Sequence, residues 1–292
     1  MALYVVATPI GNLDDMTIRA VDTLRKVEAI IAEDTRTYRK LSTRFSIPNK
    51  PVYSLYKGNE SARTEQLLPK LLEGLEAALV SESGTPTVSD PGALLVRRCL
   101  DSGVRVVPIP GPSTLTALLS ASGIFCPHFT FLGFLPDKKP VEAVVKALDA
   151  GNTVVFFENP RRMAAVLDQL AAAAPTARLV VGRELTKKFE EIWSCRAADA
   201  PEMFRLKSLK GEMAVVVEPD RGAAADREPD LTNLRSSLSR FRNDSVPLAT
   251  AVRRLADDFD LPRRRIYAEA LKLYAERVQE TDETAGPEAP SR

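Results

Sequence analysis

Four segments gather residue types that could bind a small ligand or move a proton. Each follows a predicted strand: residues 7–15 (ATPIGNLDD), 33–36 (EDTR), 80–92 (VSESGTPTVSDPG) and 106–114 (VVPIPGPST). Glycine permits turns that a Cβ would block, and proline stiffens the backbone around them. In open α/β sheets, ligands bind at the carboxyl ends of the strands. The sequence therefore predicts rigid, backbone-lined ligand loops along one edge of a sheet.

The segment 80–92 carries the strongest of these signals. A connection between a strand and a helix usually has about 2–6 residues, and longer ordered ones are often functional. This segment offers hydroxyls, amides and acids but no Lys or Arg, which disfavours a triphosphate and favours a zwitterionic or neutral ligand. The segment 7–15 has neither GxGxxG nor GK[ST], so it is no dinucleotide fingerprint or P-loop. An ordinary helix connection explains it equally well.

The segment 33–36 offers two adjacent carboxylates, Glu33 and Asp34, followed by Thr35 as a candidate helix N-cap. Adjacent strand residues point to opposite faces, which makes a paired acid–base role weak. Four cations follow within one short predicted helix: Arg36, Arg39, Lys40 and Arg44. They form either a phosphate-binding patch or a solvated face.

Composition excludes several classes of protein. Forty basic against 39 acidic side chains leave a net charge of +1, so any nucleic-acid surface must be local. Three dispersed cysteines, Cys99, Cys126 and Cys195, exclude a disulfide framework and a zinc site built only of Cys and His. We therefore expect no bound metal and a reducing, cytoplasmic location. The first residues predict no signal peptide, and no window approaches the ~20 apolar residues of a membrane span. A single histidine, His128, excludes mechanisms that need two.

Alternating strands and helices must position these segments, so we predict an α/β fold with two α/β domains and a small C-terminal helical module. The domains are predicted at 1–122 and 123–219, with a linker at 220–230, the module at 231–278 and a disordered tail at 279–292. In the first domain, strands are expected at 3–7, 29–32, 52–55, 77–80 and 104–109, and helices at 17–27, 35–45, 62–73, 93–101 and 113–122. In the second, strands are expected at 129–136, 153–157, 178–182, 189–194 and 213–217, and helices at 141–148 and 161–174.

The module resembles a helix-turn-helix. Helices are predicted at 231–241, 248–259 and 263–278, and the sequence DLP joins the last two. Leu255 and Phe259 are expected to face inward, while Arg263 and Arg264 open the last helix, where a recognition helix contacts nucleic acid. A small helical dimerisation or capping element is the alternative.

Together the segments resemble the tetrapyrrole methylase superfamily and, within it, the ribosomal RNA small subunit methyltransferase I family. The motifs are VVATPIGNLDDMTIRA (5–20), AEDTRTYRKL (32–41), VSESGTPTVSDPG (80–92), PIPGPSTLTALLSASG (108–123), FTFLGFLP (129–136), FFENPRR (156–162), GRELTKKFEE (182–191) and KGEMAVVV (210–217). The resemblance implies a homodimer that binds S-adenosylmethionine (SAM) in a cleft between two α/β domains. It also implies methylation of a cytidine 2′-hydroxyl in small-subunit (16S) ribosomal RNA, with either the free RNA or the assembled small subunit as substrate. The sequence departs from the family in two places. It reads SESGTP, with Glu82 and Ser83, where the family usually has SDAGTP, and it lacks the histidines that the family usually has before Asn59.

Site residues follow from the resemblance and from position. The expected SAM-binding residues are Pro9, Gly11, Gly84, Thr85, Pro86, Gly111 and Ser113. The expected RNA contacts are Asn12, Arg36, Arg39, Arg161, Arg162, Lys187, Arg263 and Arg264. Methyl transfer to a hydroxyl needs positioning and gains from a general base, for which the candidates are Glu33, Asp34, Asp90, Glu158 and Glu184. The alternatives are a tetrapyrrole or other small-molecule methyltransferase, and a non-catalytic RNA-binding factor.

Overall fold

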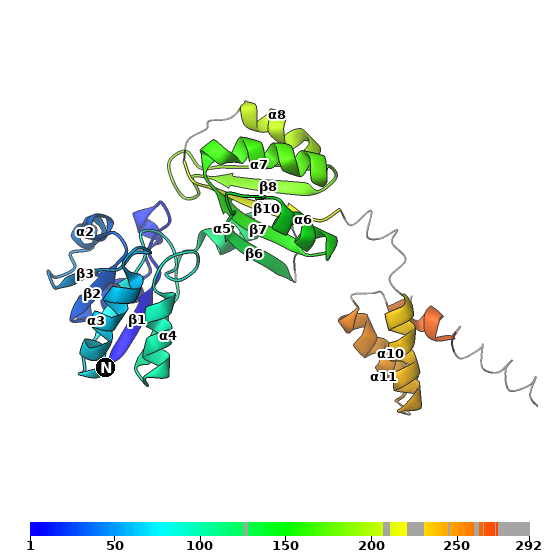
Figure 1. Ribbon diagram of the computed structural model, residues 1–292, viewed down its shortest axis with the longest axis horizontal. Helices are drawn as coiled ribbons and strands as arrows, with labels where there is room; N and C mark the ends of the chain where they lie inside the picture. Colours follow the sequence, from blue (N-terminus) through cyan, green and yellow to red (C-terminus); the bar gives the residue numbers. More distant parts are fainter. Residues whose placement is uncertain are drawn as a thin grey trace, which may run out of the picture. The chain divides into compact units, whose positions relative to one another are not determined.

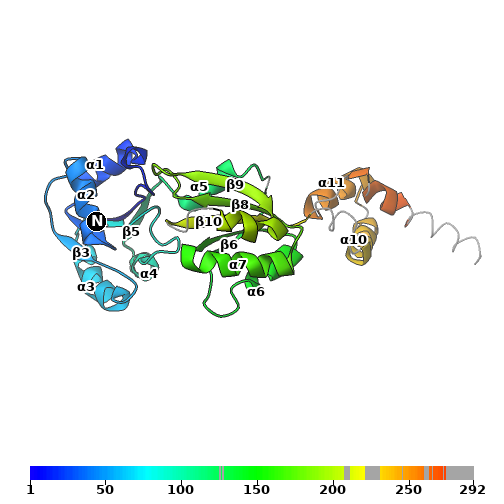
Figure 2. The same cartoon turned by 90° about the horizontal axis from the view of Figure 1, so that it is seen from above.

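The computed structural model describes residues 1–124, 126, 128–206, 211–220, 231–244, 246–259, 263–264, 266–271 and 273. The chain divides into two compact units, Met1–Asp220 and Arg221–Arg292 (Figures 1 and 2). Residues 221–230 of the predicted linker and the predicted tail 279–292 lie outside the described residues. The domain boundaries therefore stay predictions.

The first five strands form one parallel sheet in the order β3-β2-β4-β1-β5. They are β1 (Ala2–Val6), β2 (Ala29–Ala32), β3 (Val52–Ser54), β4 (Ala77–Val80) and β5 (Arg105–Ile109). Every residue of β2 and β4 is buried. Continuous apolar strands of this kind are typical of a parallel sheet covered on both faces.

Two pairs of helices cover that sheet. Helices α1 (Ile18–Lys26) and α2 (Thr35–Arg44) pack on the face that holds Ile30, and α3 (Glu60–Leu72) and α4 (Ala93–Asp101) on the face that holds Ile31. Consecutive residues of β2 thus feed opposite cores, as the alternation of strand side chains requires. The loops with candidate chemistry all leave the carboxyl edge of this layer.

The loops after β1 and β4 are bonded to each other. Thr8 N donates to Gly84 O at 2.8 Å, and Gly84 N donates to Thr8 O at 3.0 Å. Strands β1 and β4 are neighbours, yet the chain leaves β1 toward β2 on one side and leaves β4 toward β5 on the other. Such a reversal opens a crevice at the sheet edge.

The second sheet has the order β6-β7-β10-β8-β9, in which β6 and β7 are parallel and the other pairs antiparallel. Its strands are β6 (Phe129–Phe134), β7 (Thr153–Glu158), β8 (Arg178–Arg183), β9 (Glu191–Arg196) and β10 (Met213–Glu218). Strand β10 is the last of these strands in sequence but lies in the centre of the sheet. A central strand is covered on both faces, which agrees with its run of buried residues, Met213–Val217. Edge strand β9 alternates between half-buried and exposed residues.

Helices cover both faces of the second sheet too. Helices α6 (Glu142–Asp149), α7 (Pro160–Ala173) and α8 (Ala200–Arg205) pack on one face. Helix α5 (Thr114–Ala121) packs on the other face, where its buried Leu118 meets Val180 and Val216. Although α5 follows the first sheet in sequence, it contributes its core residue to the second.

A few elements differ from the sequence-based expectation. Strand β9 begins at Glu191 rather than 189, because 187–190 form a turn in which Glu190 N donates to Lys187 O. Helix α8 and the 3-10 turns η1 (Leu13–Asp15) and η2 (Ala197–Asp199) were not predicted. Each has at most six residues, too few for a helical repeat of apolar residues to show in the sequence.

The second unit is helical where it is described. Helices α10 (Leu231–Asn243) and α11 (Leu248–Asp258), with helical residues 263–264, 266–271 and 273, enclose a core that includes Leu234, Leu255 and Ile266. Phe259 packs against this core, and Arg263 and Arg264 are exposed. The predicted DLP turn (260–262) lies outside the described residues. Across the described chain, no helix is both long and apolar enough to cross a membrane.

Candidate active site

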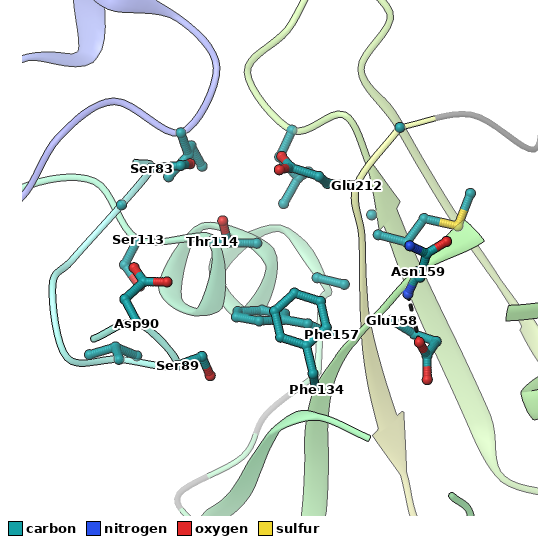
Figure 3. A pocket seen from close by; sticks show the side chains of 18 of the residues that line it. Ser83, Ser89, Asp90, Ser113, Thr114, Phe134, Phe157, Glu158, Asn159 and Glu212 are labelled. Atoms are coloured by element: carbon teal, nitrogen blue, oxygen red, sulfur yellow. Dashed lines mark hydrogen bonds between the residues drawn. The ribbon is translucent and has the colours of Figure 1, made fainter. Parts of the chain in front are cut away.

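A cavity of about 540 Å³ opens at the carboxyl edge of the first sheet (Figure 3). One wall comes from the loop after β4 and the start of α5, and includes Gly84, Thr85, Asp90 and Ser113. The other comes from the second sheet, and consists of Phe134, Phe157, Glu158, Asn159, Pro160, Arg161, Gly182, Leu185, Gly211, Glu212, Met213 and Ala214. Its volume falls within the range of small-molecule sites, about 300–1,000 Å³.

Backbone bonds hold the first wall in place. Gly84 has φ +82°, a conformation that L-residues adopt only with strain, and its amide and carbonyl are both bonded to Thr8. Thr85 Oγ1 donates to Pro112 O at 3.0 Å, which ties this loop to the PGPS segment. Thr87 and Ser89 also have positive φ, 72° and 70°. Strained conformations at non-glycine residues are typical of functional loops.

Glu60 fixes the end of the same loop. Its Oε1 accepts hydrogen bonds from Gly92 N at 2.9 Å and Leu94 N at 3.0 Å, at the beginning of α4. A carboxylate there satisfies unpaired amides and opposes the positive end of the helix dipole. The preceding Asn59 accepts from Tyr56 N at 2.8 Å. Asn59 and Glu60, the two residues that remain of the histidine-containing family segment, are thus tied to backbone.

Aromatic rings and a helix start form the second wall. Phe157 makes edge-to-face contacts with Phe131 and Phe134 at centroid distances of 5.1 and 5.7 Å. Phe134 is 63% exposed, a large exposure for an aromatic side chain beside a cavity. Asn159 caps α7 by accepting from Arg161 N at 3.0 Å.

Two of the five candidate bases lie at the end of β2, outside the cavity lining. Asp34, rather than Thr35, is the N-cap of α2. Hydrogen bonds from the Arg36 side chain and backbone lower the pKa of Asp34 to about 2. Glu33 Oε2 accepts from Glu82 N at 3.0 Å. A carboxyl whose pKa is this low accepts a proton only weakly at neutral pH, so Asp34 is a poor candidate for the base.

Two further candidates are held by cations. Glu158 is 2% exposed; its Oε2 lies 3.3 Å from Arg162 Nη2 and its Oε1 accepts from Asn159 N at 2.7 Å (Figure 3). Glu184 Oε1 lies 2.9 Å from Lys187 Nζ. Burial would raise the pKa of Glu184, but the Lys187 bond and the Glu212 amide outweigh it and leave the pKa lowered.

Asp90 is the fifth candidate, and its carboxyl points into the cavity between the two walls (Figure 3). Burial and the nearby Glu33 raise the pKa of Asp90 to about 7, and a hydrogen bond with Ser81 offsets only part of this. Glu82, the first residue that departs from the family motif, also has a raised pKa, because of burial and the charges of Asp34 and Glu33. The other departure, Ser83, lines the cavity.

The predicted SAM-binding residues divide into two groups. Gly84, Thr85 and Ser113 line the cavity, whereas Pro9, Gly11, Pro86 and Gly111 are not among its lining residues. Gly11 instead packs against the turn after β8: a Cβ there would lie 2.8 Å from both Leu185 O and Thr186 Oγ1. Most of the second wall was missed, although aromatic residues at the ends of β6 and β7 were a usable signal.

The predicted RNA contacts also divide. Arg161 lines the cavity and Arg39 is exposed on α2. Three others are paired with carboxylates of the protein itself: Arg36 with Asp34 at 2.8 Å, Arg162 with Asp137 at 2.7 Å, and Lys187 with Glu184 at 2.9 Å and with Glu212 at 3.0 Å.

Loop contacts account for Asn12 and Lys187. Asn12 accepts from Asp14 N at 3.1 Å, and its own amide donates to Thr186 Oγ1 at 3.0 Å. Burial would lower the pKa of Lys187, but its bonds to Glu184 and Glu212 leave the pKa raised. Within the described residues, no group of three or more His, Cys, Asp or Glu could hold a metal ion.

The comparisons with known proteins agree with this architecture. The family model "Tetrapyrrole (Corrin/Porphyrin) Methylases" matches residues 2–201. The crystal structure of the methyltransferase CobJ superimposes with a TM-score of 0.56 at 21% identity, covering 75% of this chain and 94% of CobJ. The chain therefore has the two-sheet α/β fold of the tetrapyrrole methylases, which confirms the predicted fold class.

Relatives of greater identity define the family more closely. "Ribosomal RNA small subunit methyltransferase I" of Synechocystis is 40% identical over 279 residues, 94% of this chain and 99% of the relative. The protein of the same name from Escherichia coli O157:H7 is 38% identical over 275 residues, 92% and 94% of the two chains. The chain belongs to the ribosomal RNA small subunit methyltransferase I family, and it is a SAM-dependent methyltransferase.

Proposed function

We propose that this protein transfers a methyl group from SAM to the 2′-hydroxyl of a cytidine in small-subunit ribosomal RNA. The observation that carries the proposal is the extent of the match to the two ribosomal RNA methyltransferases. It covers more than nine-tenths of the chain, whereas the tetrapyrrole methylase model ends at residue 201. The residues beyond 201 include two helices of the C-terminal unit.

The cavity has the chemistry that SAM requires. Phe134 and Phe157 offer aromatic surface for a purine, and Thr85 and Ser113 offer hydroxyls. At Gly84 the backbone itself forms the wall: a Cβ there would lie 3.4 Å from Ile10 Cγ2, another lining residue. The carboxyl of Glu212 suits a positively charged ligand. We assign SAM to this cavity, with Gly84, Thr85 and Ser113 among its contacts.

SAM supplies, when bound, a methyl group on a positively charged sulfur, which an oxygen nucleophile can displace. The protein's contribution is to orient that nucleophile and to exclude water. Orientation alone corresponds to effective concentrations of about 10⁵–10⁸ M in well-aligned reactions. The fixed loop 81–92, bonded to Thr8, Glu60 and Pro112, is suited to such positioning.

We assign the RNA backbone to the exposed cations near the cavity and on α2. Arg161 lines the cavity and is exposed at the first turn of α7. Arg39 and Lys40 are exposed on α2. Arg263 and Arg264 of the C-terminal unit are exposed as well and would add phosphate contacts. Such contacts give affinity and register rather than sequence specificity.

Two further features complete the proposal. We propose a homodimer, which the family resemblance implies. We also propose a cytoplasmic location, supported by the ribosomal RNA substrate and by three cysteines that are all free.

Transfer of labelled methyl groups tests the proposal. The protein and methyl-labelled SAM are incubated in three separate samples. The first contains small subunits that lack the modification, the second naked small-subunit RNA, and the third a tetrapyrrole. We expect label in RNA of the first or second sample and none in the tetrapyrrole. Label in the tetrapyrrole would support the small-molecule alternative, and SAM binding without any transfer would support the non-catalytic one.

A further inference from the structure

We propose that the Asp90 carboxylate is the general base that takes the proton from the ribose 2′-hydroxyl during methyl transfer. The proposal rests on the proposed function and names one group among the five candidates. It follows from which carboxyl faces the cavity and which carboxyls are already engaged.

The cavity has three carboxyls in its described lining, those of Asp90, Glu158 and Glu212. Glu158 is bonded to the Asn159 amide and paired with Arg162. Glu212 is paired with Lys187 at 3.0 Å. Protonating either would break an ion pair, and each paired cation favours the charged form of its carboxyl. No ion pair of Asp90 occurs in the described part of the protein within 4.0 Å.

The surroundings of Asp90 favour proton uptake. Carboxyls face it from three elements: Glu33 after β2, Glu82 after β4 and Glu212 before β10. The one cation in the described lining is Arg161, on the opposite wall. Burial and these like charges raise the pKa of Asp90 to about 7, against the Ser81 hydrogen bond. A general base works best when its pKa lies near the working pH.

The proposed step balances without another reactant. The 2′-oxygen forms a bond to the methyl carbon while the bond from that carbon to sulfur breaks, and the sulfur leaves uncharged. The hydroxyl proton passes to Asp90, which later releases it to water. A hydroxyl is a poor nucleophile while protonated, and a positioned base accelerates such steps by about 10²–10⁴-fold.

The test compares Asp90→Asn with Glu212→Gln, a substitution of a paired carboxyl in the same cavity. We expect Asp90→Asn to lower kcat for RNA methylation by about 10²–10⁴-fold, with SAM affinity changed less than about 3-fold. For wild type, log kcat should rise with pH and level off near pH 7. Asp90→Glu should be faster than Asp90→Asn, and its kcat should again depend on pH. Glu212→Gln should still level off with pH, but at a lower pH than wild type, because one like charge near Asp90 is removed.

Several results would overturn the assignment. A near-normal rate and pH profile in Asp90→Asn would show that another group takes the proton. A loss of SAM affinity that accounts for the lost rate would make Asp90 a ligand of SAM instead. Thermal unfolding controls for misfolding, and the variant should be no less stable than wild type at pH 8, because it removes a partly buried charge. If wild type methylates no RNA, the proposed function and the base assignment both fail.

Discussion

Replacing Gly84 with valine separates backbone strain from loss of the SAM site. Gly84 has φ +82°, where an L-residue costs about 1–2 kcal/mol. A Cβ would contact Ile10 Cγ2 at 3.4 Å, an ordinary van der Waals distance, but the two methyl groups of valine must find further space at the cavity wall. Overpacking of this kind costs about 1–3 kcal/mol. Each 1.4 kcal/mol corresponds to a tenfold change in Kd, so we expect SAM affinity to fall by about 5–150-fold.

Gly103 provides a matched control. It has φ +76°, a Cβ added to it would have no heavy atom within 4 Å, and it is not a lining residue of the cavity. Gly103→Val should lose a similar amount of unfolding free energy but bind SAM normally. Calorimetric titration with SAM and thermal unfolding measure the two effects. Normal SAM affinity in Gly84→Val would refute the placement of SAM beside Gly84.

Three other predictions follow from the loop contacts and from α2. Gly11→Ala should cost about 1–3 kcal/mol of unfolding free energy by overlap with Leu185 O and Thr186 Oγ1; an unchanged melting temperature would contradict that close approach. Glu60→Ala should cost about 1–3 kcal/mol and raise KM for SAM, because two amides that begin α4 lose their acceptor; an unchanged KM would show that the loop does not depend on it. Arg39→Gln should make the slope of log binding constant against log salt concentration shallower by about 0.7 per lost RNA phosphate contact, without changing SAM affinity. An unaltered slope would remove Arg39 from the RNA interface.

Local sequence predicted the elements of the first sheet closely. The bounds of β2, β4 and α4 agree with the predicted 29–32, 77–80 and 93–101. Strands β2 and β4 are short, uninterrupted apolar runs, and glycine precedes α4 at its N-cap. Apolar period and turn residues are local signals, so one sequence suffices to detect them.

The partners of charged residues could not be predicted in the same way. Arg162 resembled a phosphate contact, but Asp137, 25 positions earlier, and two backbone carbonyls hold its guanidinium. Lys187 is paired with Glu212 from a different strand connection. Such pairs depend on how distant segments meet in the fold, which local sequence patterns do not reveal.

The choice among the candidate bases had the same limit. Glu158, Glu184 and Asp90 all stood at strand ends or in loops. Only the folded protein shows that Arg162 and Lys187 engage the first two while Asp90 faces the cavity. The length and composition of the loop 80–92 nevertheless marked it as a candidate, and residues of this loop line the cavity.

Mapping the methylated atom tests the central claim most directly. Small subunits lacking the modification are treated with the protein and methyl-labelled SAM, and the RNA is digested and analysed by mass spectrometry. The account predicts one added methyl group on the ribose of one cytidine of small-subunit RNA. A methyl group on a base, or no RNA methylation by protein that binds SAM, would contradict it.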